Sequence, residues 1–242
     1  MIGRSTRSVE TAEARLDKAL GRVEEGRREA IELTMDRSEI EGADLVVEAV
    51  AEDVDVKAEV LGNAGIAAPE ADLATTTSSL GVGVIGEASR TSDSLVGLHV
   101  FNPVPDMALV EVCVPEAADP SAGDRIEAWC RSVGKTPIRV PDTPGFVVNR
   151  LLFPYLFEAV RLIDRTGLPA GDVDTCMTLG LSHPMGPLAL LDLVGLDVAV
   201  AIGEALFEET GAPGDRAPGT IVEMVDRGHL GRKSGRGFYE YG

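Results

Sequence analysis

Short apolar segments alternate with helix-like segments through residues 43–141, and no other feature constrains the fold as strongly. The apolar segments are ADLVVEAV, ADLATTTS, SLVGLHVF, ALVEVCVP and KTPIRVP. DVDVKAEVLGNAGIAA and SAGDRIEAWCRSVG lie between them and have the spacing of helices. Strands that alternate with helices form βαβ units, so the pattern predicts an α/β domain with a mostly parallel sheet.

After PDTPG, at residues 141–145, the pattern becomes helical. FVVNRLLFPYLFEAVRLIDRTG, AGDVDTCMTLG, GPLALLDLVGLDVAVAIGEALFEETG and GTIVEMVDRGHLG are helical patterns separated by Gly and Pro, and the next strand signal is GFYEYG. The sequence therefore predicts two domains, 1–142 with the sheet and 143–242 all-α. ARLDKALGRVEEGRREAIEL, within the first 40 residues, predicts a polar helix.

The charge balance restricts the partners. Lys and Arg number 22 against 40 Asp and Glu, for a net charge of −18, which argues against nucleic acid and anionic membranes as partners. Asp192 and Asp197 interrupt the longest apolar segment, so it is no membrane span. No secretory signal opens the sequence, and Cys113, Cys130 and Cys176 show no CxxC spacing. We expect reduced thiols in a soluble cytoplasmic protein.

GVGVIG, at residues 81–86, matches the G-x-G-x-x-G pattern of dinucleotide-binding loops. Such a loop needs a strand before it, a long helix after it and an acid on the next strand. Only the short EASRTSDS follows Gly86, so we interpret the segment as a turn that leaves the preceding strand. No other glycine-rich loop lies upstream. Two explanations stay open: a gene start assigned too late, or a paralogue that has lost the loop.

HVFNPVPDMALVEV contains the residues best suited to chemistry. His99 ends one apolar segment and Glu111 lies within the next, with Pro103 and Pro105 between them. A reversal at the prolines brings the two side chains together. Imidazole suits proton transfer near neutral pH, and a carboxylate on its other nitrogen fixes the tautomer. The alternative is a core histidine beside an exposed glutamate.

The same stretch resembles the H-x-F-N-P-x-P-x-M-x-L-V-E signature of the L-3-hydroxyacyl-CoA dehydrogenase family. TTTSSL, DTPGFVVNRLL, HPMGPLALLDLVGLD and GRKSGRGFYEY resemble further motifs of that family in the same order. The resemblance covers residues 44–242. It implies a Rossmann-type domain, lacking its glycine-rich βαβ unit, followed by a helical domain that forms a homodimer. The implied reaction interconverts L-3-hydroxyacyl-CoA and 3-ketoacyl-CoA with NAD, in fatty-acid β-oxidation or a related pathway.

The resemblance also implies roles for single residues. His99 is the catalytic base and Glu111 orients it, while Ser78 contacts the substrate and the cofactor. Asn149 would stabilise the reacting oxygen. For Ser78 and Asn149 the alternative is capping of a strand end and of a helix start. Thr76 stands where the family usually has Asn.

Glu52, Lys57, Asn102 and Lys233 match positions that bind the cofactor in the family. For Lys233 a solvated loop is an equal alternative. Arg232, Lys233 and Arg236 fit either a phosphate patch for CoA or a charged surface turn.

The remaining histidines, His183 and His229, are interpreted as structural and as exposed, respectively. None of the histidines has metal-ligand spacing with acids or cysteines, so no metal is expected. Two other functions stay open: a catalytically silent module for acyl-CoA binding or dimerisation, and a dehydrogenase of free hydroxy acids with the same fold.

Overall fold

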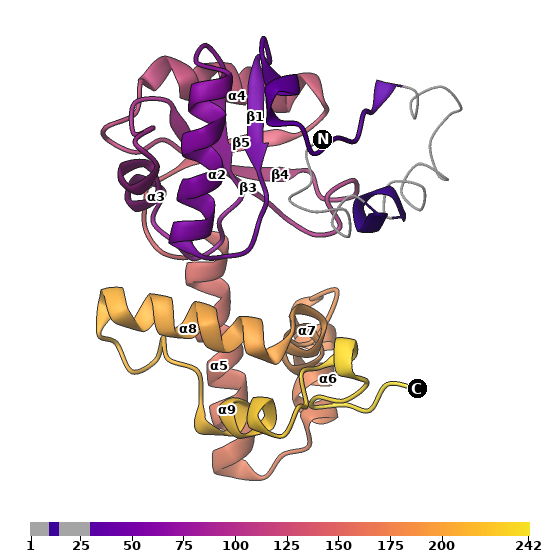
Figure 1. Ribbon diagram of the computed structural model, residues 1–242. Coiled ribbons are helices and arrows are strands. Elements are labelled where there is room, and N and C mark those ends of the chain that lie inside the picture. Colours follow the sequence, from indigo (N-terminus) through magenta and orange to yellow (C-terminus); the bar gives the residue numbers. More distant parts are fainter. Residues whose placement is uncertain (1–9, 15–29) are drawn as a thin grey trace.

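The computed structural model describes residues 10–14 and 30–242. Figure 1 shows a sheet-containing part and a helical part, with α5 (Val148–Thr166) running from one into the other. Most of the polar helix predicted for residues 14–33 lies outside the described residues. No described helix is both long enough and apolar enough to cross a membrane.

Among the described residues, the sheet has five strands in the order β1 (Leu45–Glu48), β2 (Asp72–Thr75), β3 (Leu95–Val100), β4 (Leu109–Cys113) and β5 (Thr136–Val140). All neighbouring strands are parallel except β3 and β4, which are antiparallel. The prediction of a mostly parallel sheet is confirmed. Parallel neighbours need a crossover, whereas the proline-containing reversal between β3 and β4 needs none.

Helices cover both faces of the sheet. α2 (Val54–Ala67) and α3 (Val82–Ser89) follow β1 and β2, and pack on the face that carries Leu73 and Leu95. α4 (Pro120–Ser132) packs on the face that carries Ala74 and Val96. Leu73 and Ala74 are consecutive, and so are Leu95 and Val96, because successive side chains of a strand point to opposite faces. The central strands therefore carry apolar residues on both faces, as in other sheets covered on both sides.

GVGVIG forms helix rather than the predicted turn. Five of its six residues begin α3, and Gly81 is the N-cap. The backbone N–H groups of Val82 and Gly83 donate to the Asp142 carboxylate at 2.8 and 2.7 Å. A carboxylate is favourable at the positive end of a helix. Asp142 thus occupies the place that a phosphate takes in a dinucleotide loop, and the glycines serve packing instead.

The helical part contains α5, α6 (Ala170–Leu181), α7 (Pro187–Val194), α8 (Leu196–Thr210) and α9 (Gly219–Asp226) around one apolar core. Residues 186–211 read as a single helical pattern in the sequence, but the chain breaks into α7 and α8 at Gly195. The φ of Gly195 is +107°, a conformation that side-chain-bearing residues rarely adopt.

GFYEYG does not form the predicted strand. The N–H groups of Phe238 and Tyr239 donate to the buried carboxylate of Asp192, both at 2.9 Å, and the Tyr241 hydroxyl donates to it at 3.0 Å. Because a side chain takes these backbone donors, they are not available to a partner strand. The C-terminal segment instead closes over α7, and η3 (Arg232–Ser234) precedes it.

Candidate active site

His99 and Glu111 form a buried hydrogen-bonded pair on adjacent strands. They lie directly opposite each other in the antiparallel register of β3 and β4. His99 Nδ1 lies 2.7 Å from Glu111 Oε2, and both side chains are at least 95% buried. Glu111 is therefore not the exposed residue of the alternative interpretation. The Nδ1 contact leaves Nε2 as the ring nitrogen that can exchange a proton with a ligand.

The second oxygen of Glu111 binds the start of α5. Oε1 accepts the backbone N–H groups of Val147 at 3.0 Å and Val148 at 2.9 Å. Burial by itself raises the pKa of Glu111. The hydrogen bonds from His99, Val148 and Val147 outweigh burial, so the pKa is lowered and the carboxylate stays ionised. One carboxylate thus joins the histidine to the linker between the two parts of the chain.

Two aromatic rings flank the imidazole. The ring centroid of Phe101 lies 4.7 Å from that of His99, and the centroid of Phe146 lies 5.3 Å from it. Phe146 is 2% exposed and has a φ of +47°, which is unusual for a bulky residue. This backbone turn directly precedes the two N–H groups that bind Glu111.

Asn149 lies in the first turn of α5 and is buried. Within the part of the chain that the structure describes, no hydrogen bond holds its side-chain amide. The Glu111 carboxylate already accepts the backbone N–H groups of Val147 and Val148 at this helix start. Capping by Asn149, the alternative considered from the sequence, is therefore not needed for these two groups. The amide remains available to a ligand.

Ser78 lies in the loop that follows β2, and the Glu52 carboxylate holds this loop. Oε1 of Glu52 accepts hydrogen bonds from the backbone N–H groups of Ser78 at 2.8 Å and Ser79 at 3.0 Å. It also accepts from the hydroxyls of Thr77 at 2.7 Å and Ser79 at 3.0 Å. Among the described residues, the Ser78 hydroxyl has no protein partner.

Behind this loop lies a buried ion pair. Lys57 Nζ is 3.0 Å from Oε1 of Glu48 and 3.3 Å from Oε2 of Glu52. Lys57 and Glu48 are 1% and 3% exposed. Glu48 also accepts hydrogen bonds from the Thr75 hydroxyl and the Val50 N–H, both at 2.6 Å. Charged and polar atoms need hydrogen-bond partners when they are buried, and the carboxylates of Glu48 and Glu52 each have several.

Asn102 is exposed in the loop between β3 and β4. Lys135 holds this loop from the start of β5: its ammonium group donates to the carbonyls of Val104 at 2.5 Å and Met107 at 2.8 Å. A third carbonyl, that of Pro105, lies at 3.4 Å.

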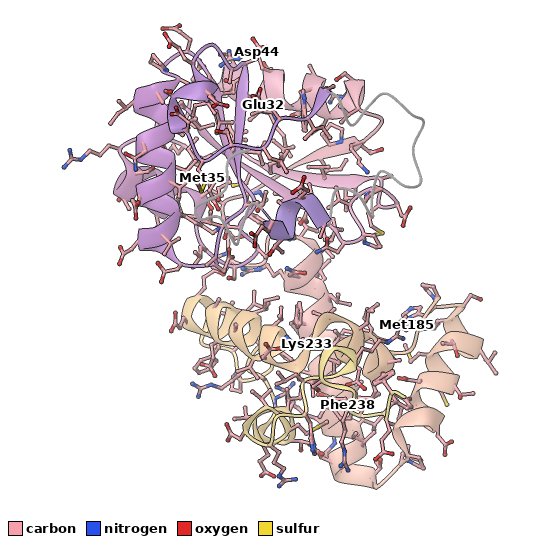
Figure 2. The ribbon with its side chains drawn as sticks, turned by 45° about the vertical axis from the view of Figure 1, so that its right-hand side comes forward. Glu32, Met35, Asp44, Met185, Lys233 and Phe238 are labelled. Carbon is pink, nitrogen blue, oxygen red and sulfur yellow. The ribbon has the colours of Figure 1, made fainter. Side chains whose placement is uncertain are left out.

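The charged residues of the C-terminal motif have their partners within the helical part. Figure 2 shows Lys233 in the helical part. Its ammonium group forms an ion pair with Asp197 at the start of α8. Arg236 pairs with Glu240 at 3.8 Å, and the guanidinium of Arg232 lies over the Tyr241 ring. The structure does not bring Lys233 into contact with the residues at the sheet, and these pairings favour a surface turn over a phosphate patch.

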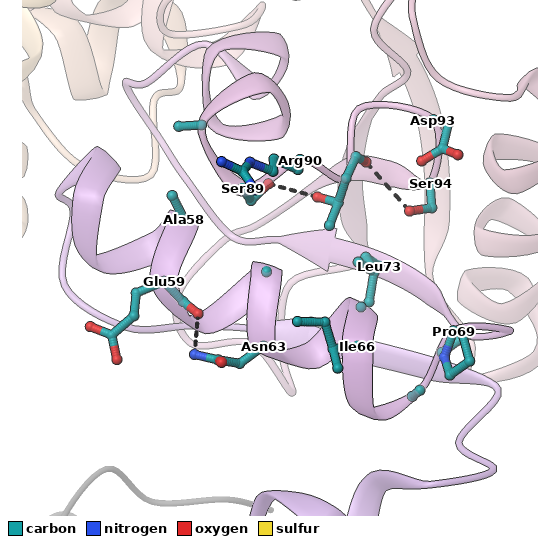
Figure 3. A pocket seen from close by; sticks show the side chains of 16 residues that line it. Ala58, Glu59, Asn63, Ile66, Pro69, Leu73, Ser89, Arg90, Asp93 and Ser94 are labelled. Carbon is teal, nitrogen blue, oxygen red and sulfur yellow. Dashed lines mark hydrogen bonds between the residues drawn. The ribbon is translucent and has the colours of Figure 1, made fainter.

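A cavity of about 680 Å³ lies away from these residues, between α2 and α3 (Figure 3). Leu73 and Ser94, at the amino ends of β2 and β3, line it, whereas His99 and the Ser78 loop lie at the carboxyl ends. Hydroxyl groups in its wall, such as those of Ser89 and Thr91, bond to each other at 2.7 Å. In the part of the chain described, no group of three or more His, Cys, Asp or Glu side chains is arranged to hold a metal ion.

Comparisons with known proteins identify the family. The model of the 3-hydroxyacyl-CoA dehydrogenase NAD binding domain matches residues 1–143, and that of the 3-hydroxyacyl-CoA dehydrogenase C-terminal domain matches residues 145–241. The chain belongs to the 3-hydroxyacyl-CoA dehydrogenase family. The resemblance noted in the sequence is thereby confirmed, and the chain is an NAD-dependent oxidoreductase.

Individual relatives agree. The 3-hydroxybutyryl-CoA dehydrogenase of Mycobacterium tuberculosis is 40% identical over 243 residues, which are 99% of this chain and 82% of that protein. The crystal structure of M. tuberculosis FadB2 superposes with a TM-score of 0.95 at 38% identity, covering all of this chain and 89% of that one. The (S)-3-hydroxybutyryl-CoA dehydrogenase PaaH1 of Ralstonia eutropha gives a TM-score of 0.91 at 33% identity, with coverage of 100% and 89%.

The edge of the sheet fits the reactive end of NAD. β1, β2 and β3 run parallel, so their carboxyl ends meet where open α/β sheets bind ligands. The free Ser78 hydroxyl and the unbonded Asn149 amide are polar groups that a ligand would satisfy. The described residues contain no glycine-rich turn between a strand and a helix for the pyrophosphate. The polar residues at this edge therefore fit the nicotinamide end of the cofactor.

Several contributing residues went unnoticed in the sequence. Glu48 could have been noticed, because burying an acid within an apolar strand segment lowers the stability of the fold unless the acid is paired. Asp142 had a weaker signal, as the acid in PDTPG. Phe146 had none, since an aromatic residue does not predict a positive φ. Lys135 was one of few lysines, but its partners are backbone carbonyls, which no side-chain pattern reveals.

Proposed function

We propose that this chain interconverts L-3-hydroxyacyl-CoA and 3-ketoacyl-CoA, with His99 as the general base. The observation that supports this role most directly is the buried Nδ1 to Oε2 hydrogen bond of 2.7 Å between His99 and Glu111 at the ligand-binding edge of the sheet. A carboxylate on Nδ1 keeps the ring proton there and leaves the Nε2 lone pair for the substrate hydroxyl.

In the oxidation direction, Nε2 of His99 takes the proton of the substrate hydroxyl while the carbon–oxygen bond becomes a carbonyl. Bound NAD would supply the acceptor for the hydride that leaves the same carbon. The imidazolium that forms lies against the ionised Glu111, which stabilises it. In reduction the same nitrogen returns the proton to the oxygen.

We assign the reacting oxygen to the Ser78 hydroxyl and the Asn149 amide. Both groups are without a protein partner among the described residues, and they lie on different parts of the chain: after β2 and at the start of α5. Two donors from different segments would hold an oxygen in one orientation and stabilise charge that develops on it. On the cofactor side we propose Glu52, Lys57, Asn102 and Ser78, whereas Lys233 would need to leave Asp197 to take part.

We also propose that the protein is a homodimer that associates through its helical part, residues 143–242, while residues 1–142 form the cofactor domain. Large apolar side chains lie exposed on its helices, with Leu151 72%, Leu179 80% and Leu181 63% exposed. Exposed apolar residues on neighbouring helices are typical of an interface. Leu179→Glu is expected to yield a monomer by light scattering, whereas Ile66→Glu on α2, at a position 82% exposed, is expected to leave the dimer intact. A monomeric unaltered protein would refute the dimer.

We propose that this reaction is part of acyl-CoA breakdown by β-oxidation and that it takes place in the cytoplasm. The three cysteines are free thiols, two of them buried, which suits a reducing compartment.

The test of activity is acetoacetyl-CoA reduction, followed as loss of NADH absorbance. His99→Gln is expected to lower kcat by at least about a thousandfold, a loss comparable to removal of a catalytic acid–base group with its orienting partner. His229→Gln, a histidine in the helical part that the mechanism does not use, is expected to retain full activity. Free acetoacetate tests the alternative of a hydroxy-acid dehydrogenase. Failure of the folded, unaltered protein to reduce the thioester would refute the proposal.

A further inference from the structure

The loop that carries Ser78 has no regular structure, yet its conformation is held by one carboxylate. Residues 76–80 lie between β2 and α3 and belong to neither. Four donors from this loop converge on Oε1 of Glu52: two backbone N–H groups and two hydroxyls, at 2.7–3.0 Å. The Ser78 hydroxyl is left out of this set and remains free for a ligand.

The number of donors limits what else Oε1 of Glu52 can bind. A carboxylate oxygen has two lone pairs, so four donors use the acceptor capacity of Oε1 completely. Oε2 faces Lys57 Nζ at 3.3 Å. Burial alone raises the pKa of Glu52, but the bonds from Thr77 and Ser78 and the charge of Lys57 lower it further than burial raises it. An ionised carboxylate accepts these bonds more strongly than a neutral one would.

Glu52 is itself held in place from the core. Lys57 comes from α2 and is almost completely buried, and its ammonium group lies between Glu52 and the buried Glu48. Glu48 belongs to β1 and also accepts the hydroxyl of Thr75, the last residue of β2. The chain of contacts runs from the sheet through Glu48 and Lys57 to Glu52, and from there to the Ser78 loop.

We propose that Glu52 is a positioning residue that acts on the reaction through Ser78, with Lys57 and Glu48 holding its carboxylate in place. This inference rests on the proposed function, in which the Ser78 hydroxyl contacts the reacting oxygen. This role is additional to the proposed contact of Glu52 with the cofactor, because the loop takes up Oε1, whereas Oε2 faces Lys57 Nζ at 3.3 Å on a side chain that is 37% exposed. The part of the effect that passes through the loop therefore appears in kcat, measured at saturating NADH.

Hydrogen exchange in the ligand-free protein tests the holding of the loop without any turnover. In Glu52→Gln the Ser78 and Ser79 amides are expected to exchange at least about tenfold faster than in the unaltered protein, because their acceptor loses its charge and its orientation. Glu87→Gln, at an exposed position on α3, is the matched control and is expected to change neither rate. Unchanged exchange in Glu52→Gln would overturn the proposal.

A double-mutant cycle tests the route of action. Glu52→Gln is expected to lower kcat by about ten- to a hundredfold in the unaltered protein, but by less than about threefold in a Ser78→Ala background. NADH affinity, measured by fluorescence titration, reports separately on any contact of Glu52 with the cofactor. Glu52→Asp, which keeps the charge but shortens the reach, serves if the amide variant unfolds in a thermal melt.

Two results would overturn the proposal: an equal loss of kcat in both backgrounds, or an NADH affinity that falls by the same factor as kcat/KM. The first would mean that Glu52 acts without Ser78, and the second that its whole effect comes from contact with the cofactor. Failure of the proposed function is distinguishable, because it appears as no turnover by the unaltered protein, while the exchange experiment still reports on the loop.

Discussion

Replacing Glu111 by Gln removes one charge from a buried side chain and leaves its volume nearly unchanged. The carboxylate has two separate tasks in the structure: Oε2 bonds to His99 Nδ1 at 2.7 Å, and Oε1 accepts from Val147 and Val148. An amide has one oxygen and one NH₂ group, so it can accept on one side only. Every orientation of the Gln side chain therefore fails at one of these tasks.

The cost follows from the orientation. If the amide oxygen faces α5, the NH₂ group faces Nδ1, and the imidazole must carry its proton on Nε2, where it cannot accept the substrate proton. If the oxygen faces His99, two buried N–H groups lose their acceptor, at about 1–3 kcal/mol each. By analogy with the tautomer effect of an Asp→Asn change in a catalytic triad, kcat is expected to fall by about 10³ to 10⁴. That corresponds to about 4 to 5.5 kcal/mol of activation free energy.

The assay is steady-state reduction of acetoacetyl-CoA by NADH with the thermal midpoint measured on the same samples. Glu209→Gln, at a surface ion pair with Arg150, is the control for loss of one negative charge. It is expected to change kcat by less than about twofold, since exposed ion pairs contribute little. A folded Glu111→Gln variant with kcat within tenfold of the unaltered protein would refute the assignment of Glu111 as the orienting group.

Three further changes have defined outcomes. The pKa of Glu111 lies below its ordinary 4.5 in the fold, so its stabilising contribution is complete above that pH and is lost as pH falls through the lowered value. The free energy of unfolding is therefore expected to fall less steeply with acid for Glu111→Gln than for the unaltered protein, and parallel curves would contradict this. Lys135→Met removes the ammonium group that donates to three loop carbonyls. Because hydrogen bonds from charged donors contribute about 1.5–3 kcal/mol, kcat/KM is expected to fall by about tenfold, and Lys135→Arg is expected to restore part of the loss. Asp174→Asn weakens a buried group that accepts hydrogen bonds from the Leu188 N–H and the Tyr239 hydroxyl. It is expected to lower the free energy of unfolding by about 2–4 kcal/mol in urea titration without changing NADH affinity, and a loss below about 1 kcal/mol would contradict this.

The parts of the fold that were predicted correctly depend on local patterns. The apolar segments at residues 45–48, 72–75, 95–100, 109–113 and 136–140 are strands because short apolar runs flanked by polar turns have few other ways to be buried. The errors occurred where a distant side chain intervened. Asp142 turned a glycine-rich segment into the start of α3, and Asp192 took the backbone donors of the last predicted strand.

The candidate site divides in the same way. The residue types and the proline-containing reversal pointed to His99 and Glu111, because their separation of twelve residues suits two strands joined by a loop. The spacing did not indicate that Glu111 also binds the start of α5, 36 and 37 residues away. Nor did it indicate that Glu52 holds a loop 25–27 residues further on.

By itself, then, the sequence determined the alternation of strands and helices, the change to an all-helical region, and the side chains that supply a base and its carboxylate. These are set by local periodicity and by the chemistry of single residues. The tertiary structure decided which donors each buried carboxylate binds and therefore what Glu48, Glu52 and Glu111 do. A buried charge must collect its partners from whichever segments the packed chain brings near, and that depends on the path of the whole backbone.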